Sequence, residues 1–135
     1  MTKLRIRGRR SALIFSVPTP LTETRPDMSS RAFEKTAYVV VCRDGPQGDA
    51  VRAAYTPQHM QYIETVLGDL NVAGPLYDDA AQKPIGSLYC LHTSSLARAR
   101  EIIENDPYHR HGAFASVEYF PHLPAAGQYI GGKIW

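Results

Sequence analysis

Cysteine is scarce in this 135-residue sequence, and no long hydrophobic run occurs in it. The two cysteines, Cys42 and Cys90, do not form a Cys-x-x-Cys pair. This disfavours redox or metal chemistry and favours two buried, reduced thiols. No apolar stretch approaches the roughly 20 residues of a membrane span, and the length suffices for one core without a separate cofactor domain. We therefore predict a single soluble domain in the cytoplasm, with no cofactor and no membrane partner.

The part of the chain that is expected to fold also lacks an excess of positive charge. Its formal net charge is +2, but residues 1–36 carry 8 Lys and Arg against 3 Asp and Glu, whereas residues 37–135 carry 7 against 10. Binding to a polyphosphate backbone requires clustered Lys and Arg on the folded surface. Nucleic acid is therefore not an expected partner.

Residues 1–36 differ in character from the rest of the chain. They are basic and contain Pro18, Pro20 and Pro26, so they offer little from which a core can be built. We expect a flexible, dispensable extension, or a start assigned too far upstream of Met28. The Arg-rich, acid-poor beginning also suits an organelle transit peptide, which would place the protein in an organelle matrix.

Hydrophobic patterning from residue 37 onward predicts alternating strands and helices. The expected strands are residues 37–42, 70–76, 86–92 and 112–120. The expected helices are residues 49–67 and a helix that Ser94 or Ser95 caps and that ends at Asn105. The domain is then residues 37–135, and about residues 122–135 form a C-terminal tail.

Pro57 falls inside the first predicted helix. Proline removes a hydrogen bond and clashes with the preceding turn, so we expect either a helix that begins with Thr56 as its cap or a bend at this point. In both cases His59 lies on the inward face, whose apolar residues are Val51, Tyr55, Ile63 and Val66.

The order strand, helix, strand, strand, helix, strand predicts an α+β fold of the ferredoxin-like kind, with both helices on one face of a four-stranded antiparallel sheet. The central strands are apolar on both faces, so the face without helices needs a cover. A second copy of the chain is the simplest cover. We therefore predict a homodimer, and we expect residues 127–135 to help seal it through Trp135.

This topology brings distant segments to one edge of the sheet. The first helix, the ends of the second and third strands, and the end of the second helix all meet there. The edge gathers His59, Asp106, Arg52, Gly74, Pro75, Ser87 and Tyr108. We predict a small-molecule pocket lined by these residues.

His59 and Asp106 are the polar pair most suited to chemistry. We place His59 at the positive end of one helix and Asp106 at the negative end of another, so each would relieve the other. A carboxylate on one ring nitrogen leaves the other nitrogen as base or acid toward a ligand. The structural alternatives are a core histidine and a turn-forming aspartate. Arg52 lies on about the same face as His59 and is either an anion clamp or a solvated surface residue.

Several short motifs occur in a fixed order along the chain. They are Tyr38-Val39-Val40 with Asp44-Gly45-Pro46, Arg52 seven positions before His59-Met60-Gln61-Tyr62-Ile63, Ala73-Gly74-Pro75-Leu76, Gly86-Ser87-Leu88 and Asn105-Asp106-Pro107-Tyr108. Over about residues 37 to 121 they resemble the YCII-related, or YciI-like, proteins. The resemblance implies a dimeric α+β barrel of two ferredoxin-like sheets packed face to face. It also implies an active site with a His and Asp pair at His59 and Asp106.

The resemblance further implies elimination, dehalogenation or isomerisation of a small, possibly cyclic organic compound. One position departs from the pattern, because many relatives carry a second Arg three residues before the His and this chain has Thr56. A strongly anionic substrate is therefore less expected.

Two other readings remain open from the sequence. The same pocket would serve a non-catalytic module that only binds a metabolite. A metal site could be built from His109 and His111 with His59, His92 or His122, since imidazole suits zinc, copper or iron. However, no third ligand lies at a diagnostic spacing, so we predict no metal.

Overall fold

A computed structural model describes residues 36–80 and 82–133. The flexible extension predicted for residues 1–36 lies outside these residues except for Thr36, and the predicted role of Trp135 lies outside them as well. Within them, no helix is both long enough and apolar enough to cross a membrane. Residues 36–131 belong to one compact unit, and β6 (Gly132–Lys133) belongs to another.

The first unit is an α+β domain with a four-stranded antiparallel sheet. In chain order its main elements are β1 (Ala37–Asp44), α1 (Gly48–Thr65), the 3-10 helix η2 (Leu67–Asp69), β2 (Leu70–Tyr77), β3 (Pro84–Leu91), α2 (Leu96–Glu104), α3 (Pro107–Arg110) and β4 (Phe114–His122). The strand order is β2-β3-β1-β4. The predicted ferredoxin-like order is confirmed. The chain continues through β5 (Ala126–Gly127) and η3 (Gln128–Ile130).

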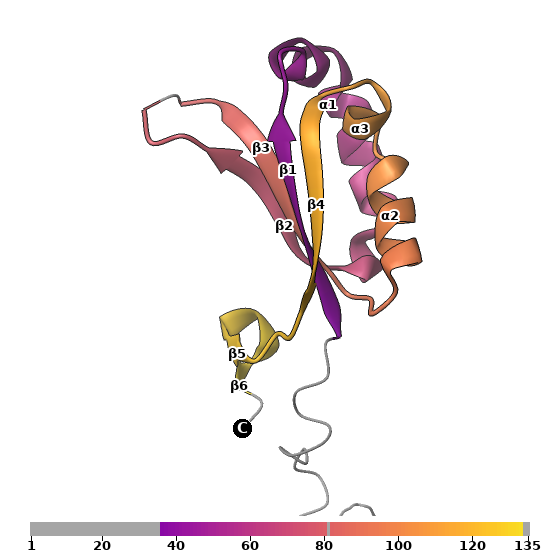
Figure 1. Cartoon of the computed structure of the whole chain (residues 1–135), viewed down its shortest axis with the longest axis vertical. Helices are drawn as coiled ribbons and strands as arrows, with labels where there is room; N and C mark the ends of the chain where they lie inside the picture. Colours follow the sequence, from indigo (N-terminus) through magenta and orange to yellow (C-terminus); the bar gives the residue numbers. More distant parts are fainter. Residues whose placement is uncertain (1–35, 81, 134–135) are drawn as a thin grey trace, which may run out of the picture. The chain divides into compact units, whose positions relative to one another are not determined.

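The helices lie on one face of the sheet and close the main core (Figure 1). From the sheet the core receives Val40 and Leu91, and from α2 it receives Ile102 and Ile103, all at most 1% exposed. Full burial of such side chains stabilises a fold by about 1.5–3 kcal/mol each. Ser95 caps α2 as predicted, because its hydroxyl accepts the Arg98 backbone N–H at 3.1 Å.

Helix α1 runs without interruption through Pro57, so Thr56 is not its N-terminal cap. The first of the two alternatives for Pro57 was therefore wrong, because the helix already begins at Gly48, more than two turns before the proline. Proline still removes one backbone donor. The Thr56 hydroxyl donates to the Arg52 carbonyl at 2.6 Å, so the turn before the proline carries a side-chain hydrogen bond.

Gly86 allows β3 to lie close to β1. A Cβ atom at this position would stand 2.3 Å from the Cys42 carbonyl oxygen, which no side chain can tolerate. Cys42 pairs with Ser87, the next residue of β3. The glycine therefore lets the strand present Ser87 and Tyr89 to the helix side at close range.

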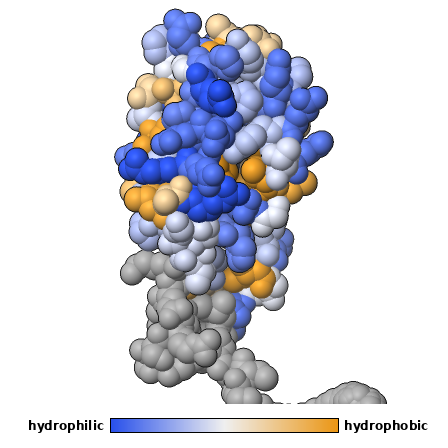
Figure 2. Space-filling model, turned by 90° about the vertical axis from the view of Figure 1, so that its right-hand side faces the viewer, coloured by the Kyte–Doolittle hydropathy of each residue, from blue (hydrophilic) through white to orange (hydrophobic). Residues whose placement is uncertain are grey.

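The other face of the sheet has no helix on it. Successive strand residues point to opposite faces, so Val39 and Val41 lie there with their register partners Cys90 and Leu88. The next partner of Val39 is Phe120, which is 49% exposed. By contrast, the outer surface of the helix layer is mostly hydrophilic (Figure 2). The domain therefore carries an apolar sheet face, here called the open face, which its own helices leave uncovered.

Candidate active site

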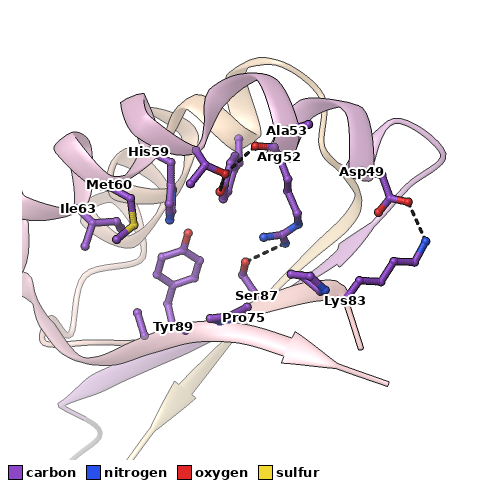
Figure 3. Close-up of a pocket in the computed structure, with 15 residues that line it drawn as sticks. Asp49, Arg52, Ala53, His59, Met60, Ile63, Pro75, Lys83, Ser87 and Tyr89 are labelled. Atoms are coloured by element: carbon purple, nitrogen blue, oxygen red, sulfur yellow. Dashed lines mark hydrogen bonds and ion pairs between the residues drawn. The ribbon is translucent and has the colours of Figure 1, made fainter. Parts of the chain in front are cut away.

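A pocket of about 710 Å³ lies between α1 and the β2–β3 strands. This volume is within the range of small-molecule sites. Its walls combine apolar groups with a few polar ones (Figure 3), and its lining is Asp49, Arg52, Ala53, Thr56, His59, Met60, Ile63, Ala73, Gly74, Pro75, Lys83, Pro84, Ser87, Tyr89 and Tyr108. The pocket explains why His59 and Ile63 on the inward face of α1 are only half-buried, because both line it, whereas Val51, earlier in the same helix, is buried.

His59 and Asp106 are in contact in this pocket. The Nδ1 atom of His59 lies 2.8 Å from Oδ1 of Asp106, within the expected range for a hydrogen bond. The carboxylate side chain is 1% exposed and the imidazole 15% exposed. The two residues are 47 positions apart in the chain, and the topology brings them together as the sequence predicts.

The helix ends act on Asp106 in the opposite sense to the prediction. Asp106 is not an unfavourable charge at the end of α2, because it is the N-cap of α3 and accepts the Tyr108 backbone N–H at 2.9 Å. The positive end of α3 therefore stabilises the carboxylate. His59 is twelfth in α1, too far along the helix for its N-terminal dipole to matter. The sequence argument missed the short helix α3, so this part of it was wrong.

Three donors converge on the two oxygens of Asp106. Oδ1 faces His59 Nδ1 and the Tyr108 N–H, and Oδ2 accepts the Tyr89 hydroxyl at 2.8 Å. A buried carboxylate is tolerated only when hydrogen bonds replace its water. With Oδ1 as acceptor, neutral His59 carries its proton on Nδ1. Among residues 36–80 and 82–133, nothing hydrogen-bonds to Nε2, so that nitrogen is available as an acceptor.

The ring of Tyr108 fixes the plane of the imidazole. The two rings stack with centroids 4.0 Å apart and planes inclined by 12°. The Arg52 guanidinium carbon lies 4.9 Å from the centroid of the same tyrosine. Together these distances hold the imidazole and the guanidinium within about 9 Å of each other.

Thr56 determines the direction of the hydrogen bond made by Tyr108. Their hydroxyl oxygens are 2.7 Å apart. The single hydroxyl proton of Thr56 is donated to the Arg52 carbonyl, which can only accept. The Tyr108 hydroxyl must therefore be the donor to Thr56. Thr56 thus anchors Tyr108.

Arg52 is neither a solvated surface residue nor a free anion clamp. Its Nε and Nη2 atoms donate to the two carboxylate oxygens of Asp44 at 2.8 and 2.9 Å. Nη2 also donates to the Gly86 carbonyl at 3.0 Å and to Ser87 Oγ at 3.2 Å. Burial works to lower the guanidinium pKa, but the hydrogen bond and charge of Asp44 outweigh it, and the pKa is raised. Within the described part of the chain only Nη1 lacks a partner, so Arg52 can still offer its N–H groups to a ligand oxygen.

The charged groups of the pocket are largely balanced. Arg52 is neutralised by Asp44, and at the rim Lys83 Nζ lies 2.7 Å from Asp49 Oδ2 (Figure 3). A ligand with several negative charges would meet no unpaired cation among these groups. The arrangement favours a neutral or singly charged ligand, in agreement with the expectation drawn from Thr56.

The pocket contains all the residues predicted to contact a ligand: Arg52, Gly74, Pro75, Ser87 and Tyr108. The sequence did not single out Tyr89 or Asp44 as residues of the site, although both make hydrogen bonds within it. Strand alternation carried a usable signal. Tyr89 follows Ser87 by two positions and therefore lies on the same face of β3.

His109 and His111, the pair considered for a metal site, are absent from the pocket lining. His111 stacks on Tyr55 with centroids 3.7 Å apart, and His109 packs against Phe114 at 6.5 Å. Across residues 36–80 and 82–133, no three His, Cys, Asp or Glu side chains are grouped so that they could hold a metal ion. The metal hypothesis therefore has no geometric support there.

Comparisons with known proteins place this geometry in a family. No curated protein matches the sequence. A solved structure of a 5-chloro-2-hydroxyhydroquinone dehydrochlorinase from Burkholderia phenoliruptrix, in complex with 2,5-dihydroxybenzoquinone, has the same fold with a TM-score of 0.60 and 22% identity, covering 69% of this chain and 97% of that one. The model of the YCII-related domain matches residues 36–122. The chain therefore belongs to the YCII-related domain family.

Proposed function

We propose that the protein is a small enzyme in which His59 transfers a proton to or from a small organic substrate. The observation that carries the proposal is the hydrogen bond from His59 Nδ1 to Asp106, which leaves Nε2 as the acceptor on a residue that lines the pocket. Asp106 orients the ring and stabilises the imidazolium that forms. Proton transfer of this kind needs no cofactor.

Elimination of a halide is the reaction that we favour. Nε2 accepts a proton from the substrate, the electron pair of the broken bond forms a new double bond, and the halide leaves with the carbon–halogen pair. Arg52 Nη1 and the Ser87 hydroxyl lie where they can bind a substrate oxygen. An isomerisation would use the same base and return the proton to a different atom.

A small, cyclic, hydroxylated compound fits the pocket best. The solved structure of similar fold is a dehydrochlorinase with a dihydroxybenzoquinone bound. In the present chain the lining offers flat apolar contacts from Ala73 and Pro75 together with separated polar groups. Such a surface suits a ring with oxygen substituents.

We also propose that the protein is a homodimer in which the open faces of two sheets pack together. This proposal is supported by the apolar residues of the open face, notably Phe120 and Val72, which are 49% and 38% exposed. Contiguous apolar surface of this kind commonly marks an interface. Participation of the tail through Trp135 stays a prediction, as does the cytoplasmic location.

Turnover of 5-chloro-2-hydroxyhydroquinone, followed by chloride release, tests the enzyme proposal. We expect His59→Ala to lower turnover by roughly 10² to 10⁴, the usual contribution of a positioned acid or base. Asp106→Asn should cause much of the same loss. His92→Ala is the matched control, because this histidine is exposed and absent from the pocket lining.

Unchanged turnover in both dyad variants would contradict the proposal. One other outcome would favour a module that only binds a metabolite. In that outcome, calorimetry detects binding of 2,5-dihydroxybenzoquinone to the wild-type protein, but neither this class of compound nor its halogenated forms react.

A further inference from the structure

Tyr89 is a buried hydroxyl that the dyad chemistry does not by itself require. It lies on β3, an interior strand of the sheet, and is 2% exposed. Its hydroxyl donates to Asp106 Oδ2 at 2.8 Å, on the oxygen that His59 does not use. The close-up shows the ring rising from the sheet toward α1, between the strand and His59 (Figure 3).

We infer that Tyr89 is a positioning residue, whose hydroxyl holds the carboxylate of Asp106 in register with His59 and moderates the negative charge that His59 experiences. The inference rests on the proposed role of the dyad. With Oδ2 tied to β3 and Oδ1 tied to the N–H of Tyr108, the carboxylate cannot rotate away from Nδ1. Contacts to α1, β3 and α3 together thus fix the orientation in which the carboxylate accepts the hydrogen bond from His59.

Tyr89 acts only as a donor over the pH range in which proteins are usually folded. Burial raises the pKa of its phenol, and the charge of Asp106 and the hydrogen bond to that residue raise it further. The proton therefore stays on the tyrosine oxygen, which remains a donor to Asp106. A residue that exchanged its proton with Asp106 would not give His59 a constant partner.

The other titratable groups around Asp106 do not duplicate this role. Burial raises the pKa of the Cys42 thiol on β1 to about 12, so the thiol is neutral. The Tyr62 hydroxyl on α1 donates instead to the Ile102 carbonyl at 2.6 Å. Arg52 is paired with Asp44, and the Tyr108 hydroxyl is bound to Thr56. In the part of the chain that the structure describes, Tyr89 is thus the hydroxyl that bonds to the carboxylate.

Loss of the Tyr89 hydroxyl has a consequence of definite sign. Without this donor, Oδ2 of Asp106 lacks its partner and the carboxylate attracts the proton of His59 more strongly. His59 then keeps its proton to higher pH than in the wild type. The carboxylate also gains rotational freedom, which spoils the orientation of Nε2 without removing any contact to the ligand's polar groups.

The first test needs no substrate. The imidazole nitrogens of His59 are followed by 15N NMR across pH in the wild type, in Tyr89→Phe and in the control Tyr62→Phe, which removes a hydroxyl that does not bond to Asp106. We expect the titration midpoint of His59 to move to higher pH in Tyr89→Phe and to stay in place in Tyr62→Phe. An unmoved midpoint in Tyr89→Phe, or equal movement in both variants, would overturn the inference.

The second test uses turnover. We expect Tyr89→Phe to lower kcat by about 10- to 100-fold with KM nearly unchanged. The ascending limb of the pH profile should move to higher pH. A purely structural role would lower the amount of folded enzyme without moving that profile, and this result would contradict the inference. Because the NMR test is independent of any reaction, a failed dyad proposal and a failed role for Tyr89 are distinguishable.

A third measurement covers the case in which Tyr89→Phe does not fold. In the wild type, a hydroxyl donated to a buried carboxylate should exchange slowly enough to be seen by proton NMR. Its signal should shift as His59 titrates. Absence of such a signal, or a signal that ignores the titration of His59, would also overturn the inference.

Discussion

The two faces of the sheet are built from the same strands but meet different surroundings. On the helix side, Val40 and Leu91 are completely buried, and the pocket opens between this face and α1. On the open face, Val39 and Val41 are only half-buried, and their neighbour Phe120 is half-exposed. Apolar composition alone therefore does not distinguish a buried core from an apolar surface that the subunit leaves uncovered.

The difference between the faces lies in their polar groups. The helix side holds the buried Asp106 with its three donors and the Arg52–Asp44 pair. The open face has instead an exposed ion pair between Arg43 and Glu118 near its edge. On the helix side, the polar groups are buried and fully hydrogen-bonded, so their arrangement is rigid and specific. The exposed ion pair on the open face contributes little to stability. We therefore assign the proposed chemistry to the first face and the proposed association to the second.

The largest difference in stability is expected between core and open-face truncations. Ile102→Ala removes a side chain that is 1% exposed and should cost about 2–5 kcal/mol of unfolding free energy. Phe120→Ala should cost the isolated subunit much less, because the ring is 49% exposed. Urea denaturation at low protein concentration measures both. Equal costs would show that the open face is part of the subunit core.

The next effect concerns assembly. Val41→Asp places a charge in the middle of the open face and should raise the dimer dissociation constant by at least about tenfold, or 1.4 kcal/mol. Ser116→Asp is the control, since Ser116 pairs with Arg43 toward the edge of the same face and contributes little apolar area. Analytical ultracentrifugation distinguishes them. A wild type that is monomeric at micromolar concentration, or equal dissociation in both variants, would contradict the proposed dimer.

A smaller effect on stability is expected at alkaline pH, and it distinguishes Cys42 from Cys90. Burial raises the pKa of the Cys42 thiol from 9.0 to about 12, and the charge of Asp106 adds to the shift. Between these values the unfolded chain has released the proton and the folded chain has not, so stability falls as pH rises, by up to about 1.4 kcal/mol per unit. Cys42→Ala should flatten this slope.

The control for that experiment is Cys90→Ala, whose cysteine lies on the open face. Thermal melts from pH 8 to 11 provide the comparison. A slope that is equally steep in Cys42→Ala and in the wild type would show that other groups, such as the buried tyrosines, cause the alkaline loss.

The smallest effect is expected at the rim of the pocket. Lys83 and Asp49 form an ion pair, but both side chains are more than 60% exposed. Surface pairs of this kind are screened by water and salt. Lys83→Gln should therefore leave the melting temperature nearly unchanged. A loss comparable to that of Ile102→Ala would mean that the β2–β3 hairpin depends on this pair.

The sequence predicts the fold well because hydrophobic periodicity and turn residues dominate it. The strand order and the meeting of His59 with Asp106 follow from topology, which the crossover rule restricts. The short helix α3 was missed because Asp106-Pro107 reads equally as the end of one helix or the start of another. The sequence therefore predicted one correct partner for Asp106, His59, with the wrong electrostatic reason.

The hydrogen-bond partners within the site were harder to predict. Nothing local in the sequence indicates that Arg52 takes Asp44, since the pair depends on how β1 and α1 are oriented at the turn between them. Tyr89 reads as a strand residue like its neighbours, and only the position of Asp106 above the sheet makes it a donor. Side-chain pairing of this kind is determined by tertiary packing, which periodicity does not encode.

The most direct test of the account is the protonation state of the His59 nitrogens, measured by 15N NMR at a pH where the ring is neutral. The account predicts that Nδ1 carries the proton, because it donates to Asp106, and that Nε2 is unprotonated and shifts when 2,5-dihydroxybenzoquinone binds. Asp106→Asn should disturb this preference. A proton on Nε2 in the wild type would contradict the account, because Nδ1 would then face Asp106 as an acceptor and Nε2 would not be a base.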